Sequence, residues 1–139
     1  MSGTATGSDA TRTMNVVDSS AWLAWFAGDA GAASFEKAIE DTKSLVVPSI
    51  CMAEVFKIVA RERGEGDALQ AVAVMHQGRI VPLDSDLAVS AAVLGLRHKL
   101  PLADSIVYAT AQLHGAAVWT QDEDFDGLPG VRYFRKQRR

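Results

Sequence analysis

The sequence has few of the residues that cross-link chains or bind soft metals, and it has no long hydrophobic run. Among 139 residues there are one cysteine and three histidines. The single cysteine, Cys51, cannot form an internal disulfide, and its apolar neighbours Ile50 and Met52 indicate a buried, inert thiol. No apolar run approaches the ~20 residues of a transmembrane helix, and the N-terminus lacks the pattern of a signal peptide. We therefore expect a cytoplasmic protein without disulfides.

The overall composition is that of one globular domain. Hydrophobic residues make up 48% of the chain and charged residues 22%, which excludes a mainly disordered protein. Residues 1–13 are mostly Gly, Ser, Thr and Ala. We expect a disordered extension there, a folded domain over residues 14–135 and a basic tail at 136–139. The formal net charge of -3 gives no general signature of nucleic-acid binding.

Short apolar runs alternate with helical patterns along the chain. We expect strands at residues 14–17, 45–47, 80–83, 116–120 and 131–134, and helices at 21–27, 32–41, 50–63, 67–77, 87–96 and between Pro101 and Gly115. This alternation predicts an α/β fold with a parallel sheet covered on both faces. Ser19 or Ser20 can cap the first helix. The helix at 87–96 is apolar almost all round, so we expect it to be buried.

Four acidic residues stand where such a fold gathers side chains. Asp18 directly follows the first strand, and Asp122 follows the fourth. Ligands of open α/β sheets bind outside the carboxyl ends of the strands, so both carboxylates reach one edge. Glu54 and Asp104 lie on helices that begin at or near that edge. Taken singly, Glu54 could pair with Lys57 or be solvated, and Asp104 could be an ordinary first-turn charge.

Together these carboxylates indicate a metal site. Like charges in one pocket raise one another's pKa values, and a divalent cation relieves the repulsion. Oxygen ligands without a His or Cys cluster favour Mg²⁺ or Mn²⁺ over zinc. Such an ion can hold a phosphate, lower the pKa of a water nucleophile and stabilise a leaving oxygen. These are the requirements of phosphodiester hydrolysis.

Four segments carry a resemblance to a known family. They are Val-Val-Asp-Ser-Ser at 16–20, Ser-Ile-Cys-Met-Ala-Glu-Val at 49–55, Leu-Pro-Leu-Ala-Asp-Ser at 100–105 and Thr-Gln-Asp-Glu-Asp-Phe at 120–125. By their order and intervals, the chain from about residue 14 to about 134 resembles the PIN-domain nucleases, most closely the VapC-type toxins of bacterial toxin–antitoxin pairs.

The resemblance implies a three-layer sandwich with a mostly parallel, five-stranded sheet of order 3-2-1-4-5. It further implies a Mg²⁺- or Mn²⁺-dependent endoribonuclease, a homodimer, an RNA substrate and an antitoxin partner. The catalytic and metal-holding quartet carried over by position is Asp18, Glu54, Asp104 and Asp122. Thr120, Asp124 and Ser20 become accessory residues, although Asp124 could equally cap the following loop.

Two surface features keep alternatives open. Trp22, Trp25 and Phe26 fall on one face of the first helix, where they could form core or bind a partner such as the antitoxin. Basic residues near the C-terminus could contact RNA phosphates or could only solubilise the chain. These basic residues are Arg135, Lys136, Arg138 and Arg139.

Other functional classes compete with the nuclease. A catalytically silent PIN-like module that binds RNA or protein would carry the same quartet. A haloacid-dehalogenase-like phosphatase also has an aspartate after its first strand, but Ser20 stands where that class needs a second acid. A response-regulator receiver domain would require a lysine at the end of a late strand, and none lies there.

Overall fold

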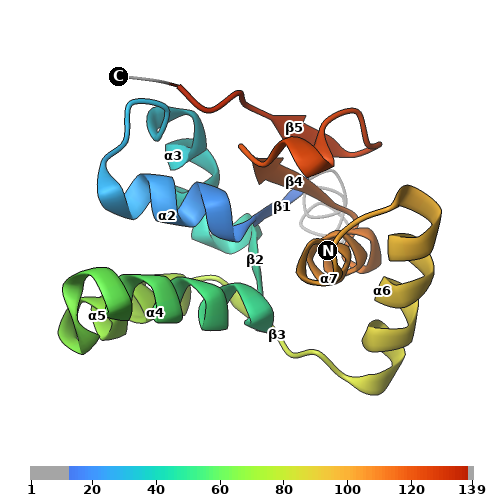
Figure 1. The fold of residues 1–139 in the computed structure, drawn as a ribbon, viewed down its shortest axis with the longest axis horizontal. Coiled ribbons are helices and arrows are strands. Elements are labelled where there is room, and N and C mark those ends of the chain that lie inside the picture. The colour runs from blue at the N-terminus through green and yellow to red at the C-terminus, as the bar shows by residue number, and fades with distance from the viewer. Residues whose placement is uncertain (1–12, 138–139) are drawn as a thin grey trace, which may run out of the picture.

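A computed structural model describes residues 13–137 of the chain (Figure 1). Five strands form one parallel sheet in the order β3-β2-β1-β4-β5. The strands are β1 (Met14–Val17), β2 (Leu45–Pro48), β3 (Arg79–Val81), β4 (Ala116–Thr120) and β5 (Val131–Tyr133). The expected fold class and strand order are thereby confirmed. The expected extension at 1–13, apart from Thr13, and the end of the expected tail at 138–139 lie outside the described residues.

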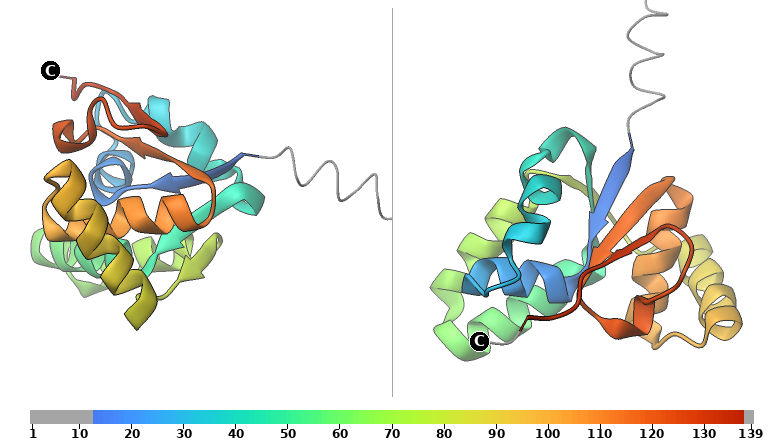
Figure 2. Two further views of the ribbon diagram at one scale, coloured as in Figure 1. Left: turned by 90° about the vertical axis from the view of Figure 1, so that its right-hand side faces the viewer. Right: turned by 90° about the horizontal axis from the view of Figure 1, so that it is seen from above.

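Helices cover both faces of the sheet. The α-helices are α2 (Ser19–Ala27), α3 (Ala33–Glu40), α4 (Ser49–Arg63), α5 (Glu65–Met75), α6 (Ser85–His98) and α7 (Leu102–Leu113), and the short 3-10 turns are η1 (Thr42–Ser44) and η2 (Glu123–Phe125). Figure 2 shows α2 and α3 on one side of the sheet and α7, with α6 outside it, on the other. Helix α4 contacts β2, α2 and α7 and pairs with α5. Over the described part of the chain, no helix is both long and apolar enough to cross a membrane.

The central strands are buried on both faces, which explains their continuous valine runs. Val16 and Val17 of β1 and Val46 and Val47 of β2 are completely inaccessible to solvent. Helices cover both faces of a parallel sheet, so side chains that point to either face are buried. The strand sequences are therefore continuously apolar and do not alternate between apolar and polar residues. Burying one such side chain stabilises the fold by roughly 1.5–3 kcal/mol.

The turn between β1 and α2 fixes Asp18. Its backbone is extended (φ -77°, ψ 171°), and its carboxylate accepts a hydrogen bond from the backbone N–H of Ala21, as an N-cap does. The expectation that Ser19 or Ser20 caps the helix is wrong, because both residues belong to its first turn. Helix α2 ends at Gly28, whose φ of 67° is unfavourable for residues with a Cβ atom.

Helix α6 departs from its expected burial. Leu87 and Ala91 are buried, but Val89, Val93 and Leu96 are 66%, 48% and 84% exposed. The expectation of a buried helix is wrong for the single chain, because α6 forms an outer layer that packs on α7. One of its apolar faces therefore remains in solvent.

Candidate active site

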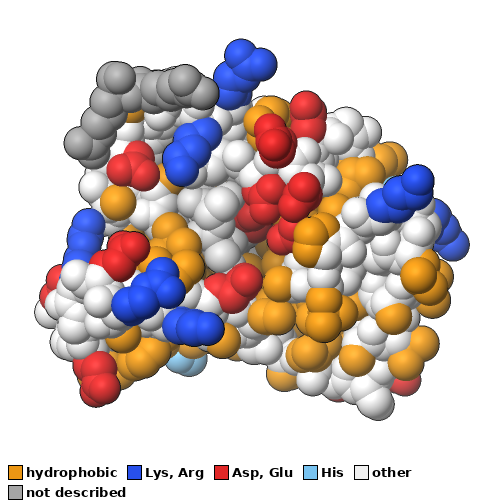
Figure 3. Space-filling model, viewed as in Figure 1, with side chains coloured by type: hydrophobic (Ala, Val, Ile, Leu, Met, Phe, Trp, Pro, Cys, Tyr) orange, Lys and Arg blue, Asp and Glu red, His pale blue; other side chains and the backbone are white. Residues whose placement is uncertain are grey.

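Acidic side chains gather near the centre of the face seen in Figure 3. Asp18 follows β1, and Asp122 follows β4, which pairs with β1. Glu54 lies in the second turn of α4, and Asp104 lies in the first turn of α7. The fold therefore delivers all four predicted residues to the carboxyl edge of the sheet.

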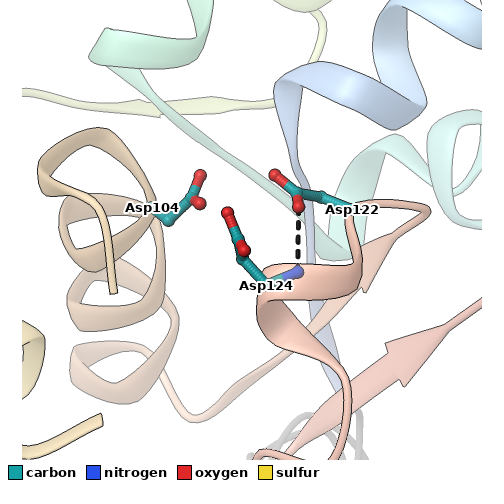
Figure 4. Close-up of side chains that lie close together, drawn as sticks. All are labelled: Asp104, Asp122 and Asp124. Carbon is teal, nitrogen blue, oxygen red and sulfur yellow. Dashed lines mark hydrogen bonds between the residues drawn. The ribbon is translucent and has the colours of Figure 1, made fainter. Parts of the chain in front are cut away.

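Three carboxylates form the tightest group, and Figure 4 shows them pointing toward one another. Carboxylate oxygens of Asp104, Asp122 and Asp124 all lie within 4.8 Å of one another. Asp122 also accepts a hydrogen bond from the backbone N–H of Asp124 at 2.9 Å, which closes the η2 turn. Asp124, expected only as an accessory residue, is thus one of the three acids of this group and the most exposed of them.

Asp18 lies deeper than these three. It is 3% exposed, and Ser20 Oγ donates to its carboxylate at 2.8 Å, while the N–H of Ala21 donates at 3.2 Å. Burial raises the pKa of Asp18 to about 6, and the charge of Asp122 adds to the rise, while hydrogen bonds from Ser20, Ala21 and Thr120 oppose it. The carboxylate is therefore oriented but incompletely compensated.

Glu54 is held by Ser19, which the sequence analysis considered only as a possible helix cap. Ser19 Oγ donates to Glu54 Oε1 at 2.6 Å. This bond, rather than an ion pair with Lys57, is the contact that the half-buried Glu54 makes. Ser19 and Ser20 are adjacent in sequence and orient different acids, Glu54 and Asp18. The only sequence signal for Ser19 was its place in the Asp-Ser-Ser turn.

Thr120 and Ser20 join the two strand ends. Thr120 Oγ1 accepts from the backbone N–H of Asp122 at 2.9 Å, and Ser20 Oγ accepts from the N–H of Gln121 at 3.4 Å. The two hydroxyl oxygens are 3.5 Å apart. The hydroxyl of Thr120 therefore holds the backbone of Asp122, and the hydroxyl of Ser20 contacts both the carboxylate of Asp18 and the backbone of Gln121.

The electrostatics of Asp104 show that the acids act as one group. Burial, followed by the charges of Asp122, Asp18, Asp124 and Glu54, raises the pKa of Asp104 to about 7. Near neutral pH this carboxyl group can hold a proton. The other four carboxylates are thus all near enough to disfavour its ionisation.

The donor set fits a hard divalent cation. It consists of carboxylate and hydroxyl oxygens, without a histidine or thiolate, and such ligands suit Mg²⁺ or Mn²⁺. Asp104, Asp122 and Asp124 could share one ion, and Asp18 and Glu54 lie behind them. Burial and then the neighbouring negative charges raise the pKa of Asp18 and of Asp104, and a cation there would favour the ionised form of both groups.

Two clefts adjoin the acids. A broad one, with a volume of about 1820 Å³, is lined by Asp122 and Glu123 and also by Arg135 and Lys136. A smaller one of about 310 Å³ lies between α2 and α4. Its lining includes Ser20, Leu23, Phe26, Ile58, Val59, Arg63, Gln121 and Lys136.

The aromatic residues of α2 divide between core and surface. Trp22 is completely buried and stacks on Phe26 with ring centroids 5.6 Å apart. Trp25 and Phe26 are half-buried. Trp22 as a direct partner contact is therefore wrong, because its ring faces the core. Phe26 lines the smaller cleft.

Sequence and structure comparisons place the chain among known proteins. Residues 16–131 match the PIN domain. Several solved structures share the fold, and three of them illustrate the likeness. A toxin–antitoxin complex from Klebsiella pneumoniae is 25% identical with a TM-score of 0.75, over 87% of this chain and 98% of that one. A second is Mycobacterium tuberculosis VapC20, a toxin that cleaves the sarcin–ricin loop. It is 22% identical with a TM-score of 0.71, and the match covers 84% of this chain and 96% of that one.

The third is a DNA-bound VapBC from Salmonella typhimurium, 14% identical with a TM-score of 0.69, over 91% of this chain and all (100%) of that one. The last two likenesses concern the fold. No curated protein matches the chain significantly. Because the match to the PIN domain spans most of the sequence and the strand order agrees, this protein belongs to the PIN domain family.

Proposed function

We propose that the protein is a metal-dependent endoribonuclease and the toxin of a toxin–antitoxin pair. The observation that carries the proposal is the convergence of Asp104, Asp122 and Asp124 beside the buried carboxylate of Asp18. Membership of the PIN domain family and the likeness to a toxin–antitoxin complex support the biological setting. The expected cytoplasmic location fits an RNA substrate.

The proposed ligands are Asp18, Glu54, Asp104 and Asp122, with Asp124 as a fifth acid. A bound Mg²⁺ or Mn²⁺ ion would supply the Lewis-acid chemistry of phosphodiester hydrolysis. The protein's own contribution is orientation. Ser20 and the N–H of Ala21 fix Asp18, Ser19 fixes Glu54, and Thr120 fixes the backbone of Asp122. Asp104 can carry a proton and release it when positive charge enters the site.

RNA would reach the acids through the broad cleft. Arg135 and Lys136 are exposed and line it together with Asp122. Their positive charge could hold phosphates beside the scissile one. Arg138 and Arg139, also proposed as phosphate contacts, lie outside the described residues.

The smaller cleft is the proposed site of the antitoxin. Leu23, Phe26 and Ile58 offer apolar contacts, and Ser20 and Gln121 line the same cleft beside the acids. An antitoxin segment with an apolar residue in this cleft could extend an arginine or lysine to the carboxylates. The apolar contact in the cleft and the ionic contact with the carboxylates would then both contribute to the affinity of the antitoxin.

The nuclease proposal is tested with Asp18→Asn and Asp104→Asn, which keep the side-chain shape and remove one charge. We expect both variants to lose most cleavage of RNA in Mn²⁺ or Mg²⁺ and to bind Mn²⁺ at least about tenfold more weakly by calorimetry. Asp126→Asn is the matched control, because Asp126 is an exposed acid of the broad cleft outside the group. Full cleavage by both variants would refute the assignment. Metal-dependent RNA binding without cleavage by the wild type would favour the catalytically silent module.

A further inference from the structure

Two adjacent aromatic residues at the end of β5 have different surroundings. Phe134 packs against the core, where its ring stacks on Trp119 with centroids 5.7 Å apart and meets the ring of Phe35 edge-on at 5.4 Å. Tyr133 is half-buried and lines the broad cleft. Its side chain makes neither an aromatic contact nor a hydrogen bond with another residue between 13 and 137. The ring of Tyr133 is therefore available to a ligand in the cleft.

The pairing of β4 with β5 places Tyr133 close to the acids. Tyr133 is the register partner of Thr120, so the two side chains point to the same face of the sheet from strands about 4.8 Å apart. Thr120 Oγ1 in turn accepts from the backbone N–H of Asp122 at 2.9 Å. Asp122 and Tyr133 also line the same cleft. A nucleic acid with one phosphate at the acids would therefore carry a neighbouring base past the ring of Tyr133.

Positive charge accompanies the ring. Arg135 and Lys136 follow Tyr133 closely in sequence, are exposed and line the same cleft. Neither forms an ion pair with any residue in the described part of the chain. These cations attract phosphates, whereas they would repel the arginine or lysine that we propose for the antitoxin. Proteins that hold single-stranded nucleic acids combine cations along the backbone with aromatic rings under the bases. The charges thus favour RNA over the antitoxin as the ligand of this ring.

We propose that Tyr133 stacks on the base of an RNA nucleotide beside the phosphate that reaches the acids, and so determines which nucleotides the cleft accepts. The inference rests on the proposed nuclease function and deepens it. A base inside a duplex is stacked on both faces, so only an unpaired base can lie on a protein ring. Every base has a π-face, so the contact distinguishes unpaired from paired nucleotides and not one base from another. Hydrolysis itself remains with the acids.

Fluorescence anisotropy with two labelled probes of about nine nucleotides tests the contact. One is a single-stranded RNA of mixed sequence, and the other is an abasic chain with the same number of phosphates. Chelator in the buffer keeps metal-dependent cleavage from consuming the RNA. We expect Tyr133→Leu to bind the RNA about 5- to 150-fold more weakly than the wild type and to bind the abasic chain equally well, because only the stacking contact is lost. Tyr133→Phe keeps the ring and should bind both probes like the wild type.

Two further variants serve as controls for charge and for loss of an aromatic ring. Arg135→Ala should weaken the binding of both probes alike, since it removes a contact with phosphate. Trp25→Leu should bind both probes like the wild type, because Trp25 is a half-buried aromatic residue that does not line the broad cleft. Circular dichroism checks that each variant is folded.

Several results would overturn the proposal. A wild type that binds both probes with equal affinity would do so without any variant. Equal weakening of both probes by Tyr133→Leu would show a structural role, and a Tyr133→Phe variant as weak as Tyr133→Leu would assign the contact to the hydroxyl group. Loss of antitoxin binding by Tyr133→Leu with unchanged RNA binding would identify the antitoxin as the ligand of the ring.

The same measurements separate this contact from the nuclease activity. A wild type that binds RNA through Tyr133 in the expected way but does not cleave it in Mn²⁺ would support the stacking contact and refute the nuclease. A wild type that cleaves RNA, together with a Tyr133→Leu variant that binds RNA equally well, would overturn the stacking contact alone.

Discussion

The environment of Asp18 has two features that favour opposite protonation states of its carboxyl group. As the N-cap of α2 it accepts a backbone N–H, which favours the ionised form. As a buried acid near Asp122 it is pushed toward the neutral form, and its pKa rises to about 6. A bound cation would oppose the second effect by favouring the ionised carboxylate, and it would leave the hydrogen bond of the cap in place.

This conflict predicts how the stability of the metal-free protein depends on pH. The pKa of Asp18 is about 6 in the folded chain and 3.8 as a free group, so the fold binds a proton between these values that the unfolded chain releases. The free energy of unfolding therefore falls as pH rises through this window. Asp18→Asn removes the titration and retains a good cap. In chelator, we expect this variant to gain on the order of 2–3 kcal/mol relative to wild type between pH 4 and pH 8.

Urea denaturation of both proteins at the two pH values measures that difference. Asp126→Asn, in which no buried acid is removed, should show no comparable pH-dependent gain. A constant difference between Asp18→Asn and wild type would show that the pKa of Asp18 is not raised.

Ser19 gives a second prediction at this scale. Ser19→Ala removes the hydroxyl that orients Glu54. Loss of such an outer contact typically weakens metal binding by roughly 10- to 100-fold. We expect the Ser19→Ala variant to bind Mn²⁺ about tenfold more weakly than the wild type, with an unchanged circular dichroism spectrum. Ser34→Ala, on the wall of the broad cleft, is the control and should bind Mn²⁺ like the wild type. Equal Mn²⁺ affinity of Ser19→Ala and wild type would show that the serine has no positioning role.

At the scale of the elements, the end of α2 allows a test of how much the left-handed backbone conformation of Gly28 contributes to stability. Gly28 has a φ of 67° and open space where the Cβ atom of an alanine would lie, so Gly28→Ala should be unfavourable through the backbone alone. We expect the free energy of unfolding to fall by about 1 kcal/mol. Gly66→Ala is the matched control. Gly66 lies in the first turn of α5 with equal space, and alanine there should be neutral or stabilising by up to about 1 kcal/mol. Equal effects of the two substitutions in chemical denaturation would contradict this account.

The elements also show what could be predicted from the sequence. Valine runs and helical periodicity sufficed for the existence and order of strands and helices, and hence for the edge where Asp18 and Asp122 meet. The strand order came from the family resemblance, because periodicity carries no information on which strands pair. Burial of α6 was mispredicted because its two apolar faces look alike in sequence, and only one packs on α7.

The site was less predictable than the elements. The position of Asp124 beside Asp104 and Asp122 depends on the η2 turn, which Asp122 itself closes by accepting the N–H of Asp124. The contact of Ser19 with Glu54 joins residues 35 positions apart. The contact of Ser19 with Glu54 has no local signal, because it depends on how α2 and α4 meet, and the approach of Asp124 to Asp104 depends on how the end of β4 meets α7.

For the whole molecule, control by an antitoxin is the main prediction. Leu23 and Phe26 line the cleft between α2 and α4, so Leu23→Ala and Phe26→Ala should each weaken antitoxin binding by about 1–3 kcal/mol, that is about 5- to 150-fold. RNA cleavage in the absence of antitoxin should persist, because neither side chain belongs to the acidic group. Leu69→Ala on α5 is the control. Normal antitoxin affinity in both folded cleft variants would place the antitoxin elsewhere.

The pairing of β1 with β4 also has a consequence for the time at which the protein becomes active during its synthesis. Asp18 is translated early, but its neighbours Asp104, Asp122 and Asp124 come from the end of the chain. A nascent polypeptide on the ribosome therefore lacks the complete acidic group until β4 has emerged and docked beside β1. Under the proposed function, the protein therefore could not cleave RNA on the ribosome that is making it, and an antitoxin would be required only for the finished molecule.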